Sequence, residues 1–185
     1  MKRKKQILLE NIKKNIAYYW LRKKLSKITR NTCFHNYDTA KTIILVFDAS
    51  NQEDYKAVYS FFKQLSDKGI RVQMLGFNYA KDSLDFYQTG VYFSYFSKQD
   101  FSWYGAIKNP KLNELLQKKW DILIDFSIEE NYFIDAITNL SNAQFKIGTK
   151  KENTPNYDFI IDIEKNRNLP YFIAQIDFYL KMIKK

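Results

Sequence analysis

Hydrophobic and polar residues follow two patterns along this chain. Short, continuous apolar runs such as TIILVF at 42–47 predict strands that are buried on both faces. Longer stretches with apolar residues every three or four positions predict helices. The expected strands cover 42–47, 70–77, 91–96, 121–126, 145–148 and 158–163. The expected helices cover 4–28, 50–69, 110–118, 129–139 and 170–182.

Strands that alternate with helices indicate βαβ units. The sequence therefore predicts an α/β fold: a three-layer, Rossmann-like domain with a mostly parallel sheet and a long basic N-terminal helix. In the segment 78–109, Tyr, Phe and Trp residues are suited either to cover the sheet edge or to line a groove. We expect a helical arm over 1–30, a connector over 31–41 and the α/β domain over 42–185.

The helix expected over 4–28 has two apolar faces. With about 100° between successive residues, one face carries Leu8, Leu9, Ile12, Ile16, Tyr19 and Trp20, and the other carries Tyr18, Leu21, Leu25 and Ile28. The change of face near residue 18 predicts either a kink or different neighbours for the two halves.

The net charge of +10 belongs to the first thirty residues. Glu10 is their one acidic residue, and the rest of the chain is neutral overall. The eleven basic residues of this arm are Lys2, Arg3, Lys4, Lys5, Lys13, Lys14, Arg22, Lys23, Lys24, Lys27 and Arg30. A concentrated positive charge attracts polyanions such as nucleic acid or acidic lipid.

Three aromatic residues, Tyr18, Tyr19 and Trp20, lie among these cations. Cations neutralise phosphates and aromatic rings stack on exposed bases. We therefore expect a non-catalytic protein whose arm docks on structured RNA, in the manner of a ribosome-associated accessory factor. The alternatives are a peripheral membrane protein held by a basic amphipathic helix, a protein partner, or a small-ligand module.

The small-ligand alternative depends on the edge of the sheet beyond the first strand. Ligands of open parallel sheets bind beyond the carboxyl ends of the strands, where Asp48, Ser50 and Asn51 are expected. Asp48 would bind a sugar hydroxyl or a metal, and Ser50 an anion at the helix start. The simpler interpretation is that Ser50 caps the helix in a capping box with Glu53. The chain has no glycine-rich phosphate-binding motif.

Other polar residues favour structural roles. Asp125 and Ser127 end a strand, and Glu129 and Glu130 are expected in the first helical turn, where acids complement the helix dipole. Cys33 and the single histidine, His35, supply too few ligands for a closed metal site. We expect no catalytic residue, no metal and no cofactor.

The longest uncharged apolar run near the start, 16–21, is far shorter than the roughly 20 residues that cross a bilayer. Charged residues also interrupt the region where a secretory signal would be apolar. The single cysteine is typical of a reducing compartment. The sequence therefore predicts a cytoplasmic protein.

Two resemblances accompany these patterns. The strand Asp121–Asp125, a helix, and then the turn Ala143–Gly148 resemble the N-terminal half of heptosyltransferase-type glycosyltransferases. That resemblance implies a Rossmann-like architecture and a nucleotide-sugar ligand, which the family binds mainly through a second domain. The whole chain is also similar to a group of uncharacterised Bacteroidota proteins with a basic leader and an α/β core.

Overall fold

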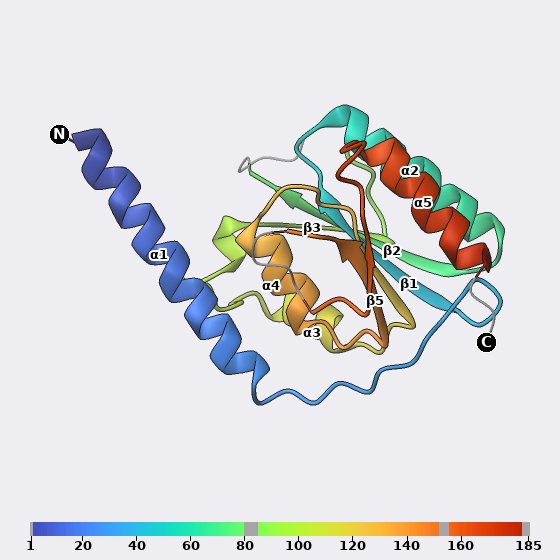
Figure 1. Ribbon diagram of the computed structural model, residues 1–185, viewed down its shortest axis with the longest axis horizontal. Helices are drawn as coiled ribbons and strands as arrows, with labels where there is room; N and C mark the ends of the chain where they lie inside the picture. The colour runs from blue at the N-terminus through green and yellow to red at the C-terminus, as the bar shows by residue number, and fades with distance from the viewer. Residues whose placement is uncertain (1, 80–84, 152–155, 183–185) are drawn as a thin grey trace.

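The computed structural model describes residues 2–79, 85–151 and 156–182, with side chains described from residue 12 onward. Its strands form one sheet in the order β3-β2-β1-β4-β5-β6 (Figure 1). Every strand pair in this sheet is parallel. The strands are β1 (Thr42–Asp48), β2 (Arg71–Asn78), β3 (Phe93–Ser97), β4 (Ile122–Asp125), β5 (Phe145–Thr149) and β6 (Phe159–Ile161).

Helices cover both faces of the sheet (Figure 1). α2 and α5 pack on one face, and α1 and α4 lie on the other together with α3. The helices are α1 (Lys2–Leu25), α2 (Gln52–Asp67), the 3₁₀ helix η1 (Lys98–Asp100), α3 (Pro110–Gln117), α4 (Tyr132–Leu140) and α5 (Leu169–Met182). This arrangement confirms the predicted three-layer, Rossmann-like α/β fold.

The sheet separates two apolar cores, because successive side chains of a strand point to opposite faces. In β1, Ile43 and Leu45 enter the core beneath α2 and α5, whereas Ile44 and Val46 enter the core beneath α1 and α4. Both sets are fully buried. The continuous apolar run at 42–47 reflects this burial on two sides.

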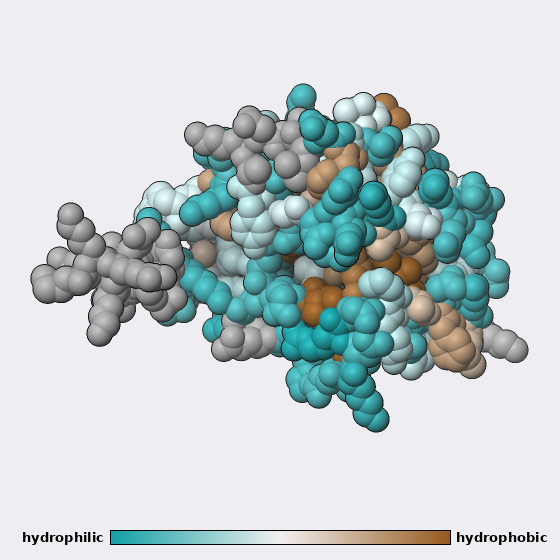
Figure 2. All heavy atoms as spheres, turned by 90° about the horizontal axis from the view of Figure 1, so that it is seen from above, coloured by the Kyte–Doolittle hydropathy of each residue, from teal (hydrophilic) through white to brown (hydrophobic). Residues whose placement is uncertain are grey.

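The surface seen in Figure 2 is mostly hydrophilic, with hydrophobic side chains gathered in a hollow near its middle.

Two helix starts differ from the sequence-based prediction. Asn51, not Ser50, caps α2, and its side-chain oxygen accepts hydrogen bonds from the backbone N–H groups of Glu53 and Asp54. Asn131 caps α4 in the same way. Glu129 and Glu130 therefore precede this helix and do not occupy its first turn. Asn is as good a cap as Ser, so composition alone did not distinguish the two positions.

α1 is a straight helix whose N-terminal half projects beyond the body (Figure 1). Ala17, Tyr18 and Leu21 anchor it and are buried in the core that α1 shares with α4. Ile12 and Tyr19, from the other apolar face, are exposed. The two faces thus have different neighbours, which was one of the two predicted outcomes. The helix ends at Leu25, three residues earlier than expected.

Candidate nucleic-acid interface

Four exposed lysines form a stripe along the described part of α1 and the turn after it: Lys13, Lys23, Lys24 and Lys27. At about 100° per residue, Lys13, Lys23 and Lys24 fall within one arc of about 100° on the helix, and Lys27 follows in the turn. Ala17, Tyr18 and Leu21, which anchor the helix, lie on a different arc. The packing of α1 on the body therefore leaves the lysine stripe facing solvent.

Two other cations of the arm are engaged by carboxylates. Arg30 makes a bidentate ion pair with Asp158, at 2.6 and 2.8 Å, and also donates to the carbonyl oxygens of Ala143 and Gln144. Lys14 is paired with Glu130 at 2.5 Å. Arg30 thus fixes the connector against the start of β5. It is a structural residue rather than part of a free cationic surface.

The other residues of the arm that were predicted to contact RNA differ in their exposure and in their partners within the protein. Arg22 is exposed on another side of α1 from the stripe and has interactions within the protein. The side chains of Lys2, Arg3, Lys4 and Lys5 lie outside the described residues. Tyr19 is 69% exposed and remains accessible to a partner. Trp20 is half-buried against Tyr104, with ring centroids 6.2 Å apart.

Tyr18 is not available to stack on a base, which corrects its inclusion among the predicted contacts. Its ring is 7% exposed and packs edge-to-face on Tyr132, with centroids 5.1 Å apart. Its hydroxyl donates to Asp135 at 2.8 Å and to Glu130 at 3.3 Å. Burial, followed by the nearby charge of Asp135, raises the pKa of Tyr18 far above its usual value. The residue is a fixed donor that locks α1 to α4.

A buried charge network lies beneath this contact. Lys151 Nζ donates to Asp125 at 3.0 Å, to Asp135 at 3.1 Å and to Ser127 Oγ at 2.6 Å. The hydroxyl groups of Tyr157 and Thr138 also donate hydrogen bonds to Asp125, at 2.7 and 3.1 Å. The Lys151, Asp125 and Asp135 side chains are 1% exposed or less. The network is closed to substrates and acts as a structural tie between β4, α4 and the segment after β5.

The electrostatics of the network follow from burial and pairing. Burial acts to raise the pKa of Asp125, but the Lys151 charge and the hydrogen bonds from Ser127 and Tyr157 outweigh it and lower the pKa. For Asp135, burial dominates and the pKa rises to about 6 despite Lys151. Burial opposes protonation of Lys151, but the two aspartates together raise its pKa. Sequence reasoning missed Lys151 because nothing near residue 151 signals a long-range partner.

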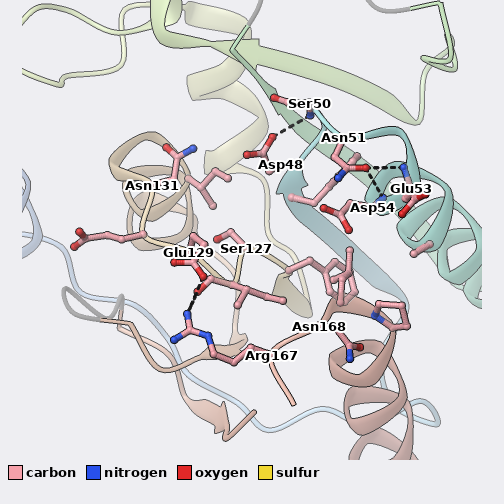
Figure 3. A pocket seen from close by; sticks show the side chains of 18 of the residues that line it. Asp48, Ser50, Asn51, Glu53, Asp54, Ser127, Glu129, Asn131, Arg167 and Asn168 are labelled. Atoms are coloured by element: carbon pink, nitrogen blue, oxygen red, sulfur yellow. Dashed lines mark hydrogen bonds and ion pairs between the residues drawn. The ribbon is translucent and has the colours of Figure 1, made fainter. Parts of the chain in front are cut away.

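A second feature is a cleft of about 700 Å³, whose side chains Figure 3 shows. It is lined by residues that follow β1 and β4, the neighbouring strands at which the strand order reverses. The structure does bring Asp48, Ser50 and Asn51 to this edge, as predicted. Five carboxylates line the cleft, from Asp48, Glu53, Asp54, Glu129 and Glu130. Arg167 is the one basic residue lining it among the described residues, and it is already paired with Glu129 at 3.0 Å.

This cleft is unsuited to a phosphate group. The amides at the start of α2 are occupied by Asn51 Oδ1, and the Ser50 amide donates to Asp48 Oδ1 at 2.9 Å. Glu53 and Asp54 in the first turn already complement the helix dipole. Burial, assisted by Asp48 and Glu53, raises the pKa of Asp54, as expected where carboxylates crowd together. These carboxylates would repel the phosphate groups of a nucleotide, whereas the expected contact of Asp48 with a sugar hydroxyl or a metal stays a prediction.

The histidine and cysteine of the connector have structural neighbours. His35 Nε2 lies 3.0 Å from Gln144 Oε1, and the Cys33 amide donates to the Gln144 carbonyl at 3.1 Å. The part of the chain that the structure describes holds no group of three His, Cys, Asp or Glu residues arranged for a metal ion. Within the same residues, no helix is both long and apolar enough to cross a bilayer.

Fold and surface together define a Rossmann-like α/β protein that carries an integral cationic helix. Residues 13–183 match a family of unknown function, DUF6913, and the chain belongs to this family. The match includes α1 from Lys13 onward, so the lysine stripe lies within the family region. Comparisons with curated proteins and with solved structures gave no match.

Proposed function

We propose that this protein binds structured RNA through the lysine stripe of α1 and catalyses no reaction. The observation that carries the proposal is the orientation of α1: its apolar anchors face the body, and Lys13, Lys23, Lys24 and Lys27 face solvent. Lys13 and Lys24 lie about 17 Å apart along the helix axis, at 1.5 Å per residue. That length spans several phosphates of a nucleic-acid strand.

The charge distribution of the body supports the same proposal. Four of the carboxylates at the strand ends, from Asp48, Glu53, Asp54 and Glu129, repel an RNA backbone, so they favour a docking orientation in which α1 meets the phosphates. The fifth, Glu130, lies beside α1 and is paired with Lys14. Recognition would then depend on backbone shape and charge. In a cell, the most abundant structured RNA of this kind is ribosomal, which makes the ribosome the first partner to test.

The test is RNA affinity measured by fluorescence anisotropy with a folded RNA hairpin at several salt concentrations. Four phosphate contacts predict a slope of log K against log[salt] of about −3 to −4. The variant Lys23→Glu/Lys24→Glu/Lys27→Glu is expected to bind at least tenfold more weakly and to lose about 2 to 3 of that slope. Purified ribosomes in a sedimentation assay should give the same ranking.

A matched control separates local contacts from net charge. Lys56→Glu/Lys63→Glu/Lys165→Glu changes the net charge equally, at exposed lysines of α2 and of the loop before α5. This control is expected to keep most of the affinity. Equal losses in both variants, or no salt-dependent binding by the wild-type protein, would contradict the proposal. Deletion of residues 1–30 is unsuitable, because Ala17, Tyr18 and Leu21 belong to the core.

One observation favours a second candidate, attachment to an anionic membrane surface. Ile12, Ile16 and Tyr19 are 45%, 38% and 69% exposed and lie next to the lysine stripe. Such an arrangement is typical of helices that lie in the lipid headgroup region. Vesicles of phosphatidylglycerol and phosphatidylcholine test this candidate. Ile12→Ser/Ile16→Ser should abolish vesicle binding and spare RNA binding if each activity uses its own residues.

A further inference from the structure

A groove of about 440 Å³ separates α1 from the segment that follows η1. Its volume lies within the roughly 300–1,000 Å³ of pockets that hold small organic groups. Aromatic side chains form much of its lining, from Phe101, Tyr132 and Phe133, and Trp103 and Tyr79 contribute to its walls. Tyr79, Phe101 and Trp103 belong to the segment 78–109, whose aromatic residues were expected either to cover the sheet edge or to line a groove. Tyr132 and Phe133 were not among the sequence-based predictions.

Trp103 is the most unusual member of this groove. It is 71% exposed, although an indole is among the side chains that gain most from burial. It meets Tyr104 edge-to-face, with ring centroids 5.5 Å apart. Most of the indole surface is therefore open to a partner.

The turn that carries Trp103 is held rigidly. The Ser102 amide donates to the Ala106 carbonyl at 2.8 Å, and the Ala106 amide donates to Ser102 Oγ at 3.0 Å. Tyr132 donates to the carbonyl of Gly105 at 3.0 Å and to that of Ala17, in α1, at 3.3 Å. The backbone of the turn, and with it the Cα of Trp103, is thus held in place relative to α1, so the turn itself needs no reordering when a partner binds.

The charges of the groove complement a phosphate backbone. Lys13 and Lys98 are exposed and line it, and Lys14 lines it as well. Its one acidic lining residue among those described, Glu130, is paired with Lys14 at 2.5 Å. Lys13 also belongs to the lysine stripe, so the groove and the stripe form one continuous surface.

The polar groups of the groove favour the stacking of a base on its aromatic rings over sequence-specific hydrogen bonds to that base. Asn131 is occupied on both sides: its Oδ1 accepts from the Phe133 amide and its Nδ2 donates to Tyr79 Oη, each at 3.0 Å. Aromatic stacking with flanking cations is tolerant of base identity.

We propose that this groove holds one unpaired nucleobase of the bound RNA, stacked on Trp103, with the flanking phosphates on Lys13 and Lys98. The proposal rests on the RNA-binding function proposed above and assigns the kind of RNA: a duplex with a bulged or flipped nucleotide. Lysines of the stripe would hold the adjoining duplex, and the groove would supply the preference for an unpaired site.

Three hairpins of equal length test the proposal: one fully paired, one with a single bulged nucleotide and one with an abasic residue at the bulge. Wild-type protein is expected to bind the bulged hairpin about tenfold more tightly than the other two. Trp103→Ala should remove this preference and leave affinity for the paired hairpin unchanged. Trp103→Phe should retain part of the preference, because the ring can still stack.

Phe178→Ala provides the control, since Phe178 is a 52% exposed aromatic of α5 on the opposite face of the sheet. It should keep the full preference for the bulge. Equal wild-type affinity for the bulged and abasic hairpins, or a preference that survives Trp103→Ala, would overturn the nucleobase site while leaving RNA binding intact. No salt-dependent binding to any hairpin would instead overturn the proposed function.

Discussion

The hydroxyl of Tyr18 in α1 donates a 2.8 Å hydrogen bond to Asp135 in α4, 117 residues further along the chain. This contact joins the cationic helix to the buried network of Asp125, Asp135 and Lys151. The helix proposed to bind RNA is therefore joined to the interior of the domain by this hydrogen bond. Substitutions in α1 and substitutions in the buried network are expected to have effects that can be measured separately.

The first prediction concerns this hydrogen bond. Tyr18→Phe should lower the free energy of unfolding by about 1.5–3 kcal/mol, because a buried carboxylate loses one donor. Tyr19→Phe is the matched control, since Tyr19 is 69% exposed, and it should change stability by less than about 0.5 kcal/mol. Urea denaturation measures both. Similar small losses for the two variants would contradict the anchoring role of Tyr18.

The second prediction concerns the cation of the network. Lys151→Met should destabilise the protein by about 3–5 kcal/mol, because Asp125 and Asp135 are left buried without their shared cation. Lys150→Met tests the neighbouring position, where the lysine side chain is 73% exposed and its pair with Glu164 is 3.8 Å long. That variant should unfold at nearly the wild-type urea concentration. A mild effect of Lys151→Met would mean that the network is not a structural tie.

The third prediction is a pH dependence set by Lys146, which is 1% exposed. Burial, joined by the charge of Arg30, lowers the pKa of Lys146 to about 7, although Asp158 opposes this shift. In the unfolded chain the lysine stays protonated to about pH 10. Between pH 7 and 9.5 the unfolded state therefore binds more protons, and the contribution of Lys146 to stability rises with pH by up to about 1.4 kcal/mol per unit.

The measurement is the free energy of unfolding at several pH values between 7 and 9.5. Lys146→Met should flatten the rise, because the group that titrates is gone. Lys111→Met, at an exposed position in α3, should keep the wild-type profile. If the wild-type and Lys146→Met curves ran parallel, the lysine would not lose its proton on folding in this range.

The fourth prediction tests the shape of the groove. Gly105 has φ +91°, and a Cβ at this position would lie 2.2 Å from Tyr132 Oη and 2.8 Å from the Ala17 Cβ. Gly69 has a similar φ of +79° but open space around it. Gly69→Ala should cost about 1 kcal/mol for the backbone conformation alone.

Gly105→Ala should cost about 1–3 kcal/mol more, because it adds overpacking between α1, α4 and the turn. Thermal unfolding of both variants gives the comparison. If the two substitutions cost the same, the turn would not be packed against α1 as the structure shows.

The predictable part of the architecture came from local signals. Continuous apolar runs gave the strands, and apolar residues at helical spacing gave the helices, within three residues at most boundaries. Tight turns and caps were less accurate, because Ser50 and Asn51 are chemically equivalent as caps and only the backbone path selects Asn51. The expected division of the chain at residues 30 and 41 stays a prediction.

The residues of the candidate site likewise divide into those that the sequence located and those that only the structure revealed. Charge counting located the lysine stripe, but it could not show that Arg30 is bound to Asp158 or that Tyr18 is buried. Those outcomes depend on partners more than a hundred residues away. The sequence left two roles open for Trp103, covering the sheet edge or lining a groove, because its exposure is decided by the path of a turn and not by its local sequence.

The amino-acid sequence by itself determined the α/β class, the parallel strand arrangement and the concentration of positive charge in the first thirty residues, because periodicity and composition act over short distances. Tertiary structure alone decided which cations of α1 face solvent, which carboxylates surround Lys151 and where an aromatic groove opens beside the helix. These features arise when the sheet brings distant segments into contact. Polar groups that lose water on burial then pair with the charged or hydrogen-bonding groups that the fold has placed beside them.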